Sequence, residues 1–128
     1  MKKAPQPRIS EAEWEVMKLF WPKAHLTAPE VVAKLKGHTA WHPPTIKTLL
    51  NRLLKKGALG YVKEGRSYRY YPRIQEQKCL RAEAESFLAR FFGGSLTPMV
   101  AHFLGERSLS AKEITELRKL LKEKNHVP

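Results

Sequence analysis

The sequence predicts a mainly α-helical protein with one small β-hairpin, and three observations support this fold class. Ser or Thr is followed three residues later by Glu at three places, a capping-box pattern that begins helices. Leucine and isoleucine recur at helical spacing through residues 46–54. Two aromatic-rich runs flank a Gly-containing turn at residues 65–67, which is typical of a hairpin.

The first two helices are predicted from their capping residues, Ser10 and Thr27. We expect the first helix to reach about Trp21 and to stop at Pro22, and the second to reach about Lys36 before Gly37. Their predicted buried faces consist of Ile9, Val16, Met17 and Phe20 in the first helix and of Val31, Val32 and Leu35 in the second.

The third helix is predicted between the stiff segment 41–44 and Gly57, because proline is tolerated in a first helical turn and glycine suits a left-handed C-cap. Its apolar face is formed by Ile46, Leu49, Leu50, Leu53 and Leu54. Residues 59–64 and 68–72 then predict the two strands of the hairpin. Helix, helix, helix, hairpin is the element order of a winged helix-turn-helix.

Helical character returns from Ile74 to the pair Gly93-Gly94, around residues 96–104, and from Lys112 to about Lys124, where Ser110 begins the third capping box. These helices are too short to be stable alone, so we expect a second copy of the chain to cover them. The residues predicted to form this dimer contact are Leu80, Ala84, Phe87, Leu88, Phe91, Val100, Phe103, Leu104, Leu117 and Leu121.

The charge of the chain is concentrated in its first part. The formal net charge is +12, and residues 1–73 carry 15 Lys and Arg against 5 Glu, whereas residues 74–128 carry 9 against 7. A strongly basic region predicts a polyanionic partner, above all nucleic acid. We therefore expect a DNA-binding domain at 1–73 and a helical dimerisation region at 74–128.

The third helix and the hairpin carry the residues expected to contact double-stranded DNA. Hydroxyl, amide and guanidinium groups suit base edges, lysines suit phosphate, and a basic hairpin tip suits the backbone or a minor groove. The predicted DNA-binding residues are Thr45, Lys47, Thr48, Asn51, Arg52 and Lys55 on the helix and Lys63, Arg66 and Arg69 on the hairpin. We interpret Tyr61, Tyr68, Tyr70 and Tyr71 as core and cross-strand packing; stacking on single-stranded bases is the alternative.

Composition argues against an enzyme or a metalloprotein. The chain has no aspartate, and its histidines (His25, His38, His42, His102 and His126) show no zinc-ligand spacing with a cysteine or glutamate pair. No catalytic constellation, cofactor or metal is therefore predicted. The single cysteine, Cys79, and the absence of a secretory signal or of an apolar stretch of ~20 residues predict a cytoplasmic protein without membrane insertion.

Two other functions fit a basic helical chain. A non-sequence-specific architectural or single-strand-binding protein would use the same positive field. A protein-interaction module could present its basic face to an acidic partner, but the mixture of Thr, Asn and Arg on the third helix favours a base-reading surface.

Two stretches carry a resemblance to a known family. ISEAEWEVMKLFW at residues 9–21 and PPTIKTLLNRLLKKGALGYVKEGRSYRYYP at residues 43–72 resemble the penicillinase repressor family of bacterial transcriptional regulators, and the similarity continues more weakly to the last helix. The resemblance implies a homodimeric winged-helix repressor on a twofold-symmetric operator, with Thr45, Lys47, Thr48 and Arg52 as operator contacts and Arg66 in the wing.

The resemblance also bears on how repression would be relieved. In one branch of the family a sensor-linked protease cleaves the repressor at an Asn-Phe bond, which implies the bond between His102 and Phe103 here, with histidine at the asparagine position. A copper-responsive branch uses a C-terminal cysteine cluster, which a chain with one cysteine does not have.

Overall fold

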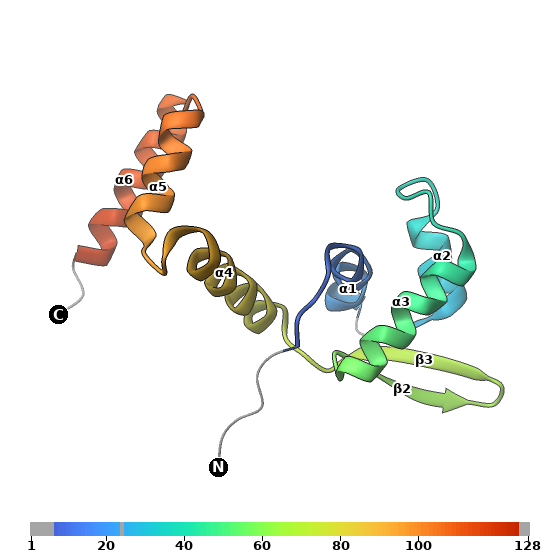
Figure 1. Cartoon of the computed structure of the whole chain (residues 1–128). Coiled ribbons are helices and arrows are strands. Elements are labelled where there is room, and N and C mark those ends of the chain that lie inside the picture. Colours follow the sequence, from blue (N-terminus) through green and yellow to red (C-terminus); the bar gives the residue numbers. More distant parts are fainter. Residues whose placement is uncertain (1–6, 24, 126–128) are drawn as a thin grey trace, which may run out of the picture. The chain divides into compact units, whose positions relative to one another are not determined.

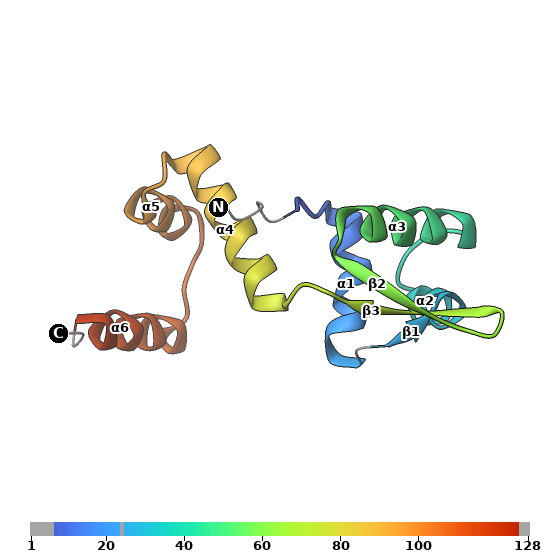
Figure 2. The same ribbon diagram turned by 90° about the horizontal axis from the view of Figure 1, so that it is seen from below.

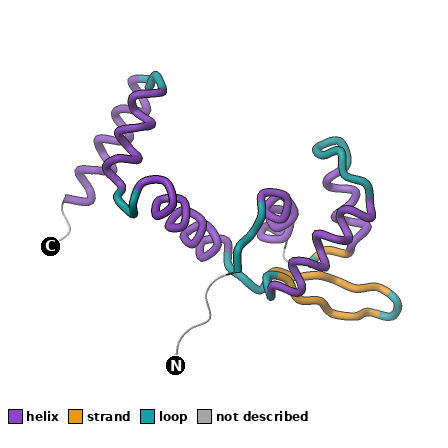
Figure 3. Tube along the Cα trace, viewed as in Figure 1, coloured by secondary structure: helices purple, strands orange, loops and turns teal. Residues whose placement is uncertain are grey.

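The computed structural model describes residues 7–23 and 25–125. The chain forms two compact units, the first ending at Ala84 and the second beginning at Glu85 (Figures 1 and 3). The first unit contains α1 (Glu11–Lys23), β1 (Leu26–Thr27), α2 (Ala28–Leu35), α3 (Pro43–Lys56), β2 (Leu59–Glu64), β3 (Ser67–Pro72) and the start of α4 (Glu76–Phe92). This order confirms the predicted winged helix-turn-helix.

Two details of the first unit differ from the sequence prediction. Helix α1 continues through Pro22 to Lys23 instead of stopping at Pro22. Pro22 cannot donate to the carbonyl four residues earlier and its ring crowds that carbonyl, so the helix continues for only one residue beyond it. The sheet also has a third strand, β1, whose two residues are too few to give a detectable period of two.

The sheet is antiparallel, with strand order β1-β3-β2. Tyr61 pairs with Tyr70, and Lys63 pairs with Tyr68, across the hairpin. The turn contains Gly65 with φ of 62°, a left-handed conformation that favours glycine. Figure 2 shows this hairpin, the wing, running beside α3 to a free tip.

The core of the first unit lies where α1, α2 and α3 pack on one another and on the base of the sheet. Its members are Ile9, Val16, Met17, Phe20, Leu26, Val31, Leu35, Ile46, Leu49, Leu50, Leu53, Ala58, Leu59 and Cys79. Val32 and Leu54 were predicted on buried faces but are only half-buried, because each lies at the edge of its apolar stripe. The core fixes which face of α3 is turned outward.

The start of α4 is anchored to the winged helix. The Trp21 indole Nε1 donates to the Ile74 carbonyl oxygen at 2.9 Å, and the Arg73 amide donates to the Ala58 carbonyl oxygen at 2.8 Å. Cys79 is buried in the core, and this burial raises the pKa of its thiol. The first turns of α4 are therefore packed on the first unit rather than connected to it by a free linker.

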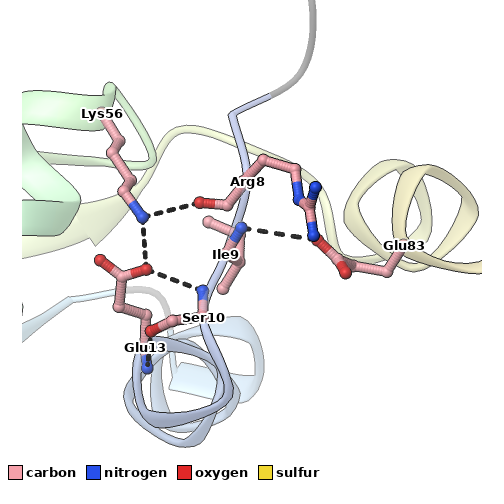
Figure 4. Close-up of polar contacts among 6 residues, drawn as sticks. All are labelled: Arg8, Ile9, Ser10, Glu13, Lys56 and Glu83. Atoms are coloured by element: carbon pink, nitrogen blue, oxygen red, sulfur yellow. Dashed lines mark hydrogen bonds and ion pairs between the residues drawn. The ribbon is translucent and has the colours of Figure 1, made fainter. Parts of the chain in front are cut away.

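A buried ion pair ties α3 to the first turn of α1 (Figure 4). The Glu13 side chain is fully buried, and its Oε1 accepts hydrogen bonds from Lys56 Nζ at 2.5 Å and from the Ser10 amide at 2.8 Å. Lys56 Nζ also donates to the Arg8 carbonyl oxygen at 2.7 Å. Burial by itself raises the pKa of Glu13, but the bonds from Lys56 and Ser10 and the charge of Lys56 lower it overall.

The second unit contains the end of α4, α5 (Leu96–Glu106) and α6 (Ala111–Asn125). The predicted capping box at Ser110 is present, since the Glu113 amide donates to Ser110 Oγ at 3.1 Å and the Ser110 amide donates to Glu113 Oε1 at 3.2 Å. None of the described residues from Glu85 onward is buried, so this unit has no apolar core within one chain.

Candidate nucleic-acid interface

Helix α3 separates an apolar face from a polar one. Ile46, Leu49, Leu50 and Leu53 are buried against the rest of the unit. All six of the predicted DNA-binding residues on this helix are exposed, namely Thr45, Lys47, Thr48, Asn51, Arg52 and Lys55. Because these aliphatic residues hold α3 against the core, its hydroxyl, amide and cationic groups lie together on one outward-facing surface.

The ends of α3 add to the positive potential of this surface. The first turn contains no acidic residue, and the last turn contains Lys55 and Lys56. The helix closes at Gly57, whose φ of 79° allows its amide to bond the carbonyl oxygens of Leu53 and Leu54. Pro43 and Pro44 have no backbone N–H, and the Thr45 amide donates to the His42 carbonyl oxygen at 3.0 Å, so the start of α3 contributes the positive end of the helix dipole but no free amide donors.

Thr48 has a defined hydrogen-bonding state. Its Oγ1 donates to the Pro44 carbonyl oxygen at 3.0 Å, within the helix. The proton of the hydroxyl is thus used internally, and the side chain offers its methyl group and oxygen lone pairs to a partner. These groups suit a thymine methyl or a base amino donor in a major groove.

The wing carries two exposed cations near its tip. Arg66 lies beside Gly65 in the turn, and Lys63 lies on β2, with its Nζ 6.0 Å from the centre of the Tyr68 ring. The Tyr61 and Tyr68 rings meet edge to face at 5.1 Å, although these side chains are 54% and 43% exposed. Tyr70 packs against the core. The tyrosines thus pack across the strands, as predicted, but two of them lie outside the core.

Arg69, the third cation predicted on the wing, is engaged in ion pairs. Its Nε donates to Glu64 Oε2 at 3.0 Å, and its Nη1 lies 3.9 Å from Glu30 Oε1. Glu30 in turn closes the capping box of α2 with Thr27. The charge of Arg69 is therefore partly neutralised by glutamates of the same chain, unlike that of Lys63 and Arg66.

A cavity of about 450 Å³, the wing cavity, joins the start of α2, the start of α3 and the wing. It is lined by Thr27, Ala28, Pro29, Val32, Pro43, Lys47, Arg66, Ser67, Tyr68 and Tyr70. Lys47 and Arg66, which belong to different elements, thus border the same space. The sequence gives no sign of this juxtaposition, because it depends on how the hairpin folds back beside the helices.

The second unit exposes many of the residues predicted for a dimer contact. Phe91, Val100, Phe103, Leu104, Leu117 and Leu121 are between 41% and 69% exposed. Ala84 and Leu80, which belong to the first unit, are exposed as well, whereas Phe87 and Leu88 are half-buried. Leu96, Ile114 and Leu120 are further exposed apolar residues that the prediction did not include.

The bond between His102 and Phe103 lies inside α5. The two rings meet edge to face at 5.6 Å, and the His102 ring lies 5.9 Å from the Phe92 ring. Proteases favour exposed, irregular chain, so cleavage here requires α5 to unwind locally.

Among the described residues, no group of three or more His, Cys and Glu is placed to hold a metal ion, and His126 lies outside these residues. Within the same residues, no helix combines the length and the apolar character needed to cross a bilayer.

The fold and the exposed basic helix beside the wing define the class of this protein, a winged helix-turn-helix DNA-binding protein. The chain belongs to the penicillinase repressor family, because the sequence profile described as "Penicillinase repressor" matches residues 9–123. The chain is 46% identical over 123 residues to the Penicillinase repressor of Bacillus licheniformis, covering 96% of this chain and 94% of the relative.

Other relatives agree with this assignment. The Methicillin resistance regulatory protein MecI of Staphylococcus aureus is 34% identical over 91% of this chain and 94% of its own length. The solution structure of the DNA-binding domain of the repressor BlaI superposes with a TM-score of 0.52 at 49% identity, over 59% of this chain and 90% of that one.

A second solution structure, of the monomeric form of Bacillus licheniformis BlaI in complex with the blaP half-operator, gives a TM-score of 0.51 at 48% identity, over 60% of this chain and 92% of that one. An Escherichia coli MarR mutant complexed with operator DNA has a TM-score of 0.51 at 18% identity, over 90% of this chain and 74% of that one, which is a likeness of fold alone.

Proposed function

We propose that this protein is a sequence-specific transcriptional repressor, not an enzyme, that binds double-stranded operator DNA in the cytoplasm. The observation that carries the proposal is the exposed polar face of α3, held outward by four buried aliphatic residues and flanked by the cationic wing. Membership of the penicillinase repressor family and a related domain solved with a half-operator support the same function.

In the proposed complex, α3 enters a major groove. The residues of its first turns, Thr45, Lys47 and Thr48, contact base edges, while Asn51, Arg52 and Lys55 contact bases or phosphates farther along. Lys63 and Arg66 of the wing contact the neighbouring backbone, and Arg69 contributes less because of its ion pairs. Repression then follows because the bound protein blocks polymerase.

The proposed active form is a homodimer on a twofold-symmetric operator. Residues 1–73 serve as the DNA-binding domain and residues 74–128 as the dimerisation region, with the first turns of α4 packed on the former. The exposed apolar side chains of α5 and α6 support this division, since a unit without its own core needs a second surface to bury them.

Relief of repression is proposed to involve cleavage of the bond between His102 and Phe103 by a sensor-linked protease. Both residues are exposed, which supports access, but the bond is part of a regular helix. Local unwinding of α5 is therefore the step that such cleavage requires.

The function is tested by selecting bound fragments from a pool of genomic duplex DNA with the purified protein. The proposal expects a recurring motif with two half-sites related by twofold symmetry and about one helical turn apart or a little more. Fragments enriched without any common motif would instead indicate the non-specific architectural protein that the charge of +12 also suits.

Arg52→Ala should weaken binding to the selected operator by about 1–3 kcal/mol per half-site, because it removes one charged contact of α3. The matched control is Lys122→Ala, which removes an exposed positive charge from α6. Gel-shift titrations at fixed salt compare the two variants. Equal losses of affinity would contradict the assignment of α3 as the reading helix.

A further inference from the structure

We infer that the wing cavity binds a small aromatic carboxylate and that this ligand excludes DNA. Only the exclusion of DNA rests on the proposed DNA-binding function. Binding of the ligand concerns the free protein and follows from the size, the lining and the charge of the cavity.

The size and the walls of the cavity suit a small apolar molecule. Its volume of about 450 Å³ lies in the range of ligand pockets, which is roughly 300–1,000 Å³. Pro29 and Val32 of α2, Pro43 of α3 and the rings of Tyr68 and Tyr70 form apolar walls. Val32, which is half-buried at the edge of its apolar stripe, lines this space.

The charged groups at the cavity favour an anion. Lys47 and Arg66 both line it, and none of the described residues in its lining is acidic. Glu30, on the adjoining helix, accepts hydrogen bonds from the Thr27 amide at 2.9 Å and the Thr27 hydroxyl at 3.0 Å, and it lies 3.9 Å from Arg69. The nearest carboxylate on α2 is therefore already engaged with its own cap and with a cation.

The apolar walls and the two cations of the cavity together specify the class of ligand. Two cations attract any anion, including a phosphate group, but a phosphate group leaves the proline, valine and tyrosine surfaces in contact with water. A flat aromatic body buries these surfaces and stacks on tyrosine, while its carboxylate reaches Lys47 or Arg66. The cavity thus matches an aromatic carboxylate better than an inorganic anion.

Binding in the cavity and binding of DNA use the same two side chains. Lys47 and Arg66 belong to the proposed DNA-contacting surface, so a carboxylate that neutralises them removes one base contact and one backbone contact and occupies the space beside the start of α3. A ligand that binds only the DNA-free state shifts the equilibrium toward that state. The cavity is therefore a built-in site for induction by a small molecule.

The first experiment titrates the full chain with naphthoate, without DNA, and follows backbone amide chemical shifts by NMR. We expect saturable shifts confined to residues around the cavity, with a Kd on the order of 1 mM or tighter. The uncharged analogue naphthamide should bind about tenfold more weakly, because it lacks the charge that Lys47 and Arg66 attract. Absence of saturation, or equal affinity for both probes, would overturn the inference.

A matched pair of variants tests the location. Pro29→Glu places a carboxylate at the cavity in the first turn of α2, where a helix favours a negative charge, so the fold should be retained. Ala33→Glu makes the same charge change on an exposed position of α2 outside the cavity. We expect Pro29→Glu to weaken naphthoate binding about tenfold or more and Ala33→Glu to leave it within about twofold. Equal effects would place the ligand elsewhere.

The second experiment adds naphthoate to the protein bound to a fluorescent duplex. Release of DNA should follow the directly measured saturation of the cavity, whereas acetate at equal ionic strength should not release it. DNA that stays bound to a saturated cavity would overturn mutual exclusion. A chain that binds naphthoate but no duplex at all would contradict the proposed function and leave the ligand site standing.

Discussion

Lys56→Met should lower the free energy of unfolding by about 3 kcal/mol, the lower end of the range for breaking a buried ion pair. Methionine retains the aliphatic stem but leaves the fully buried Glu13 carboxylate without its cation. The Oε2 atom of Glu13 has no hydrogen-bond partner among the described residues, so Lys56 and Ser10 carry its stabilisation. The lower end applies because the Lys56 side chain is 33% exposed. Urea denaturation at neutral pH measures the loss.

Lys55→Met is the matched control for this effect. Lys55 lies in the same last turn of α3 and is exposed, so both variants lose the same favourable interaction with the helix C-terminus. We expect the control to change stability by no more than about 0.5 kcal/mol, as is usual for an exposed position. Comparable losses of unfolding free energy in both variants would mean that the ion pair between Lys56 and Glu13 contributes little to stability.

The cost of Lys56→Met should also shrink in acid. The pKa of Glu13 is lowered in the folded protein, so the wild type gains stability from this group above its unfolded pKa and loses it as the pH falls through the folded value. In the variant, burial without a cation raises the pKa of Glu13, and protonation then relieves the buried charge. The difference in unfolding free energy between the two proteins should therefore narrow from neutral pH toward pH ~4.

Sequence periodicity predicts best those helices that have one side fully buried in the core. The stripe of Ile46, Leu49, Leu50 and Leu53 fixed both the existence of α3 and the face it turns to solvent. All three capping boxes are present because they depend only on residues three positions apart. These capping boxes can therefore be recognised without any knowledge of tertiary contacts.

What sequence reasoning missed depends on contacts between distant segments. Ser10 and Glu13 were recognised as a cap, but nothing local connects Glu13 with Lys56, 43 residues away. The pairing of Arg69 with Glu30 likewise appears only when the hairpin meets α2, whereas its pairing with Glu64 lies within the hairpin. The same meeting creates the wing cavity, which is why Lys47 and Arg66 could be proposed separately but not as neighbours.

The largest effect on function is expected from Leu117→Gln combined with Leu121→Gln. Both leucines lie on α6 with a spacing of four residues and are 42% and 69% exposed, so their loss should not disturb the fold of one chain. If they bury against a second copy, the variant should sediment as single chains at micromolar concentration. Its affinity for a two-half-site operator should fall by about 10²- to 10⁴-fold, since the second half-site is no longer bound by a linked partner.

Lys119→Gln combined with Glu123→Gln is the control, because it also places two glutamines four residues apart on α6 and leaves the net charge unchanged. This variant should remain dimeric and bind the operator as the wild type does. Affinity for a single half-site should be similar in all three proteins, because the α3 surface is intact in each.

A leucine variant that keeps both its dimeric mass and its operator affinity would show that the dimer uses another surface. A variant that also loses half-site binding would show that the substitutions reach the winged helix, against the division of roles between the two units.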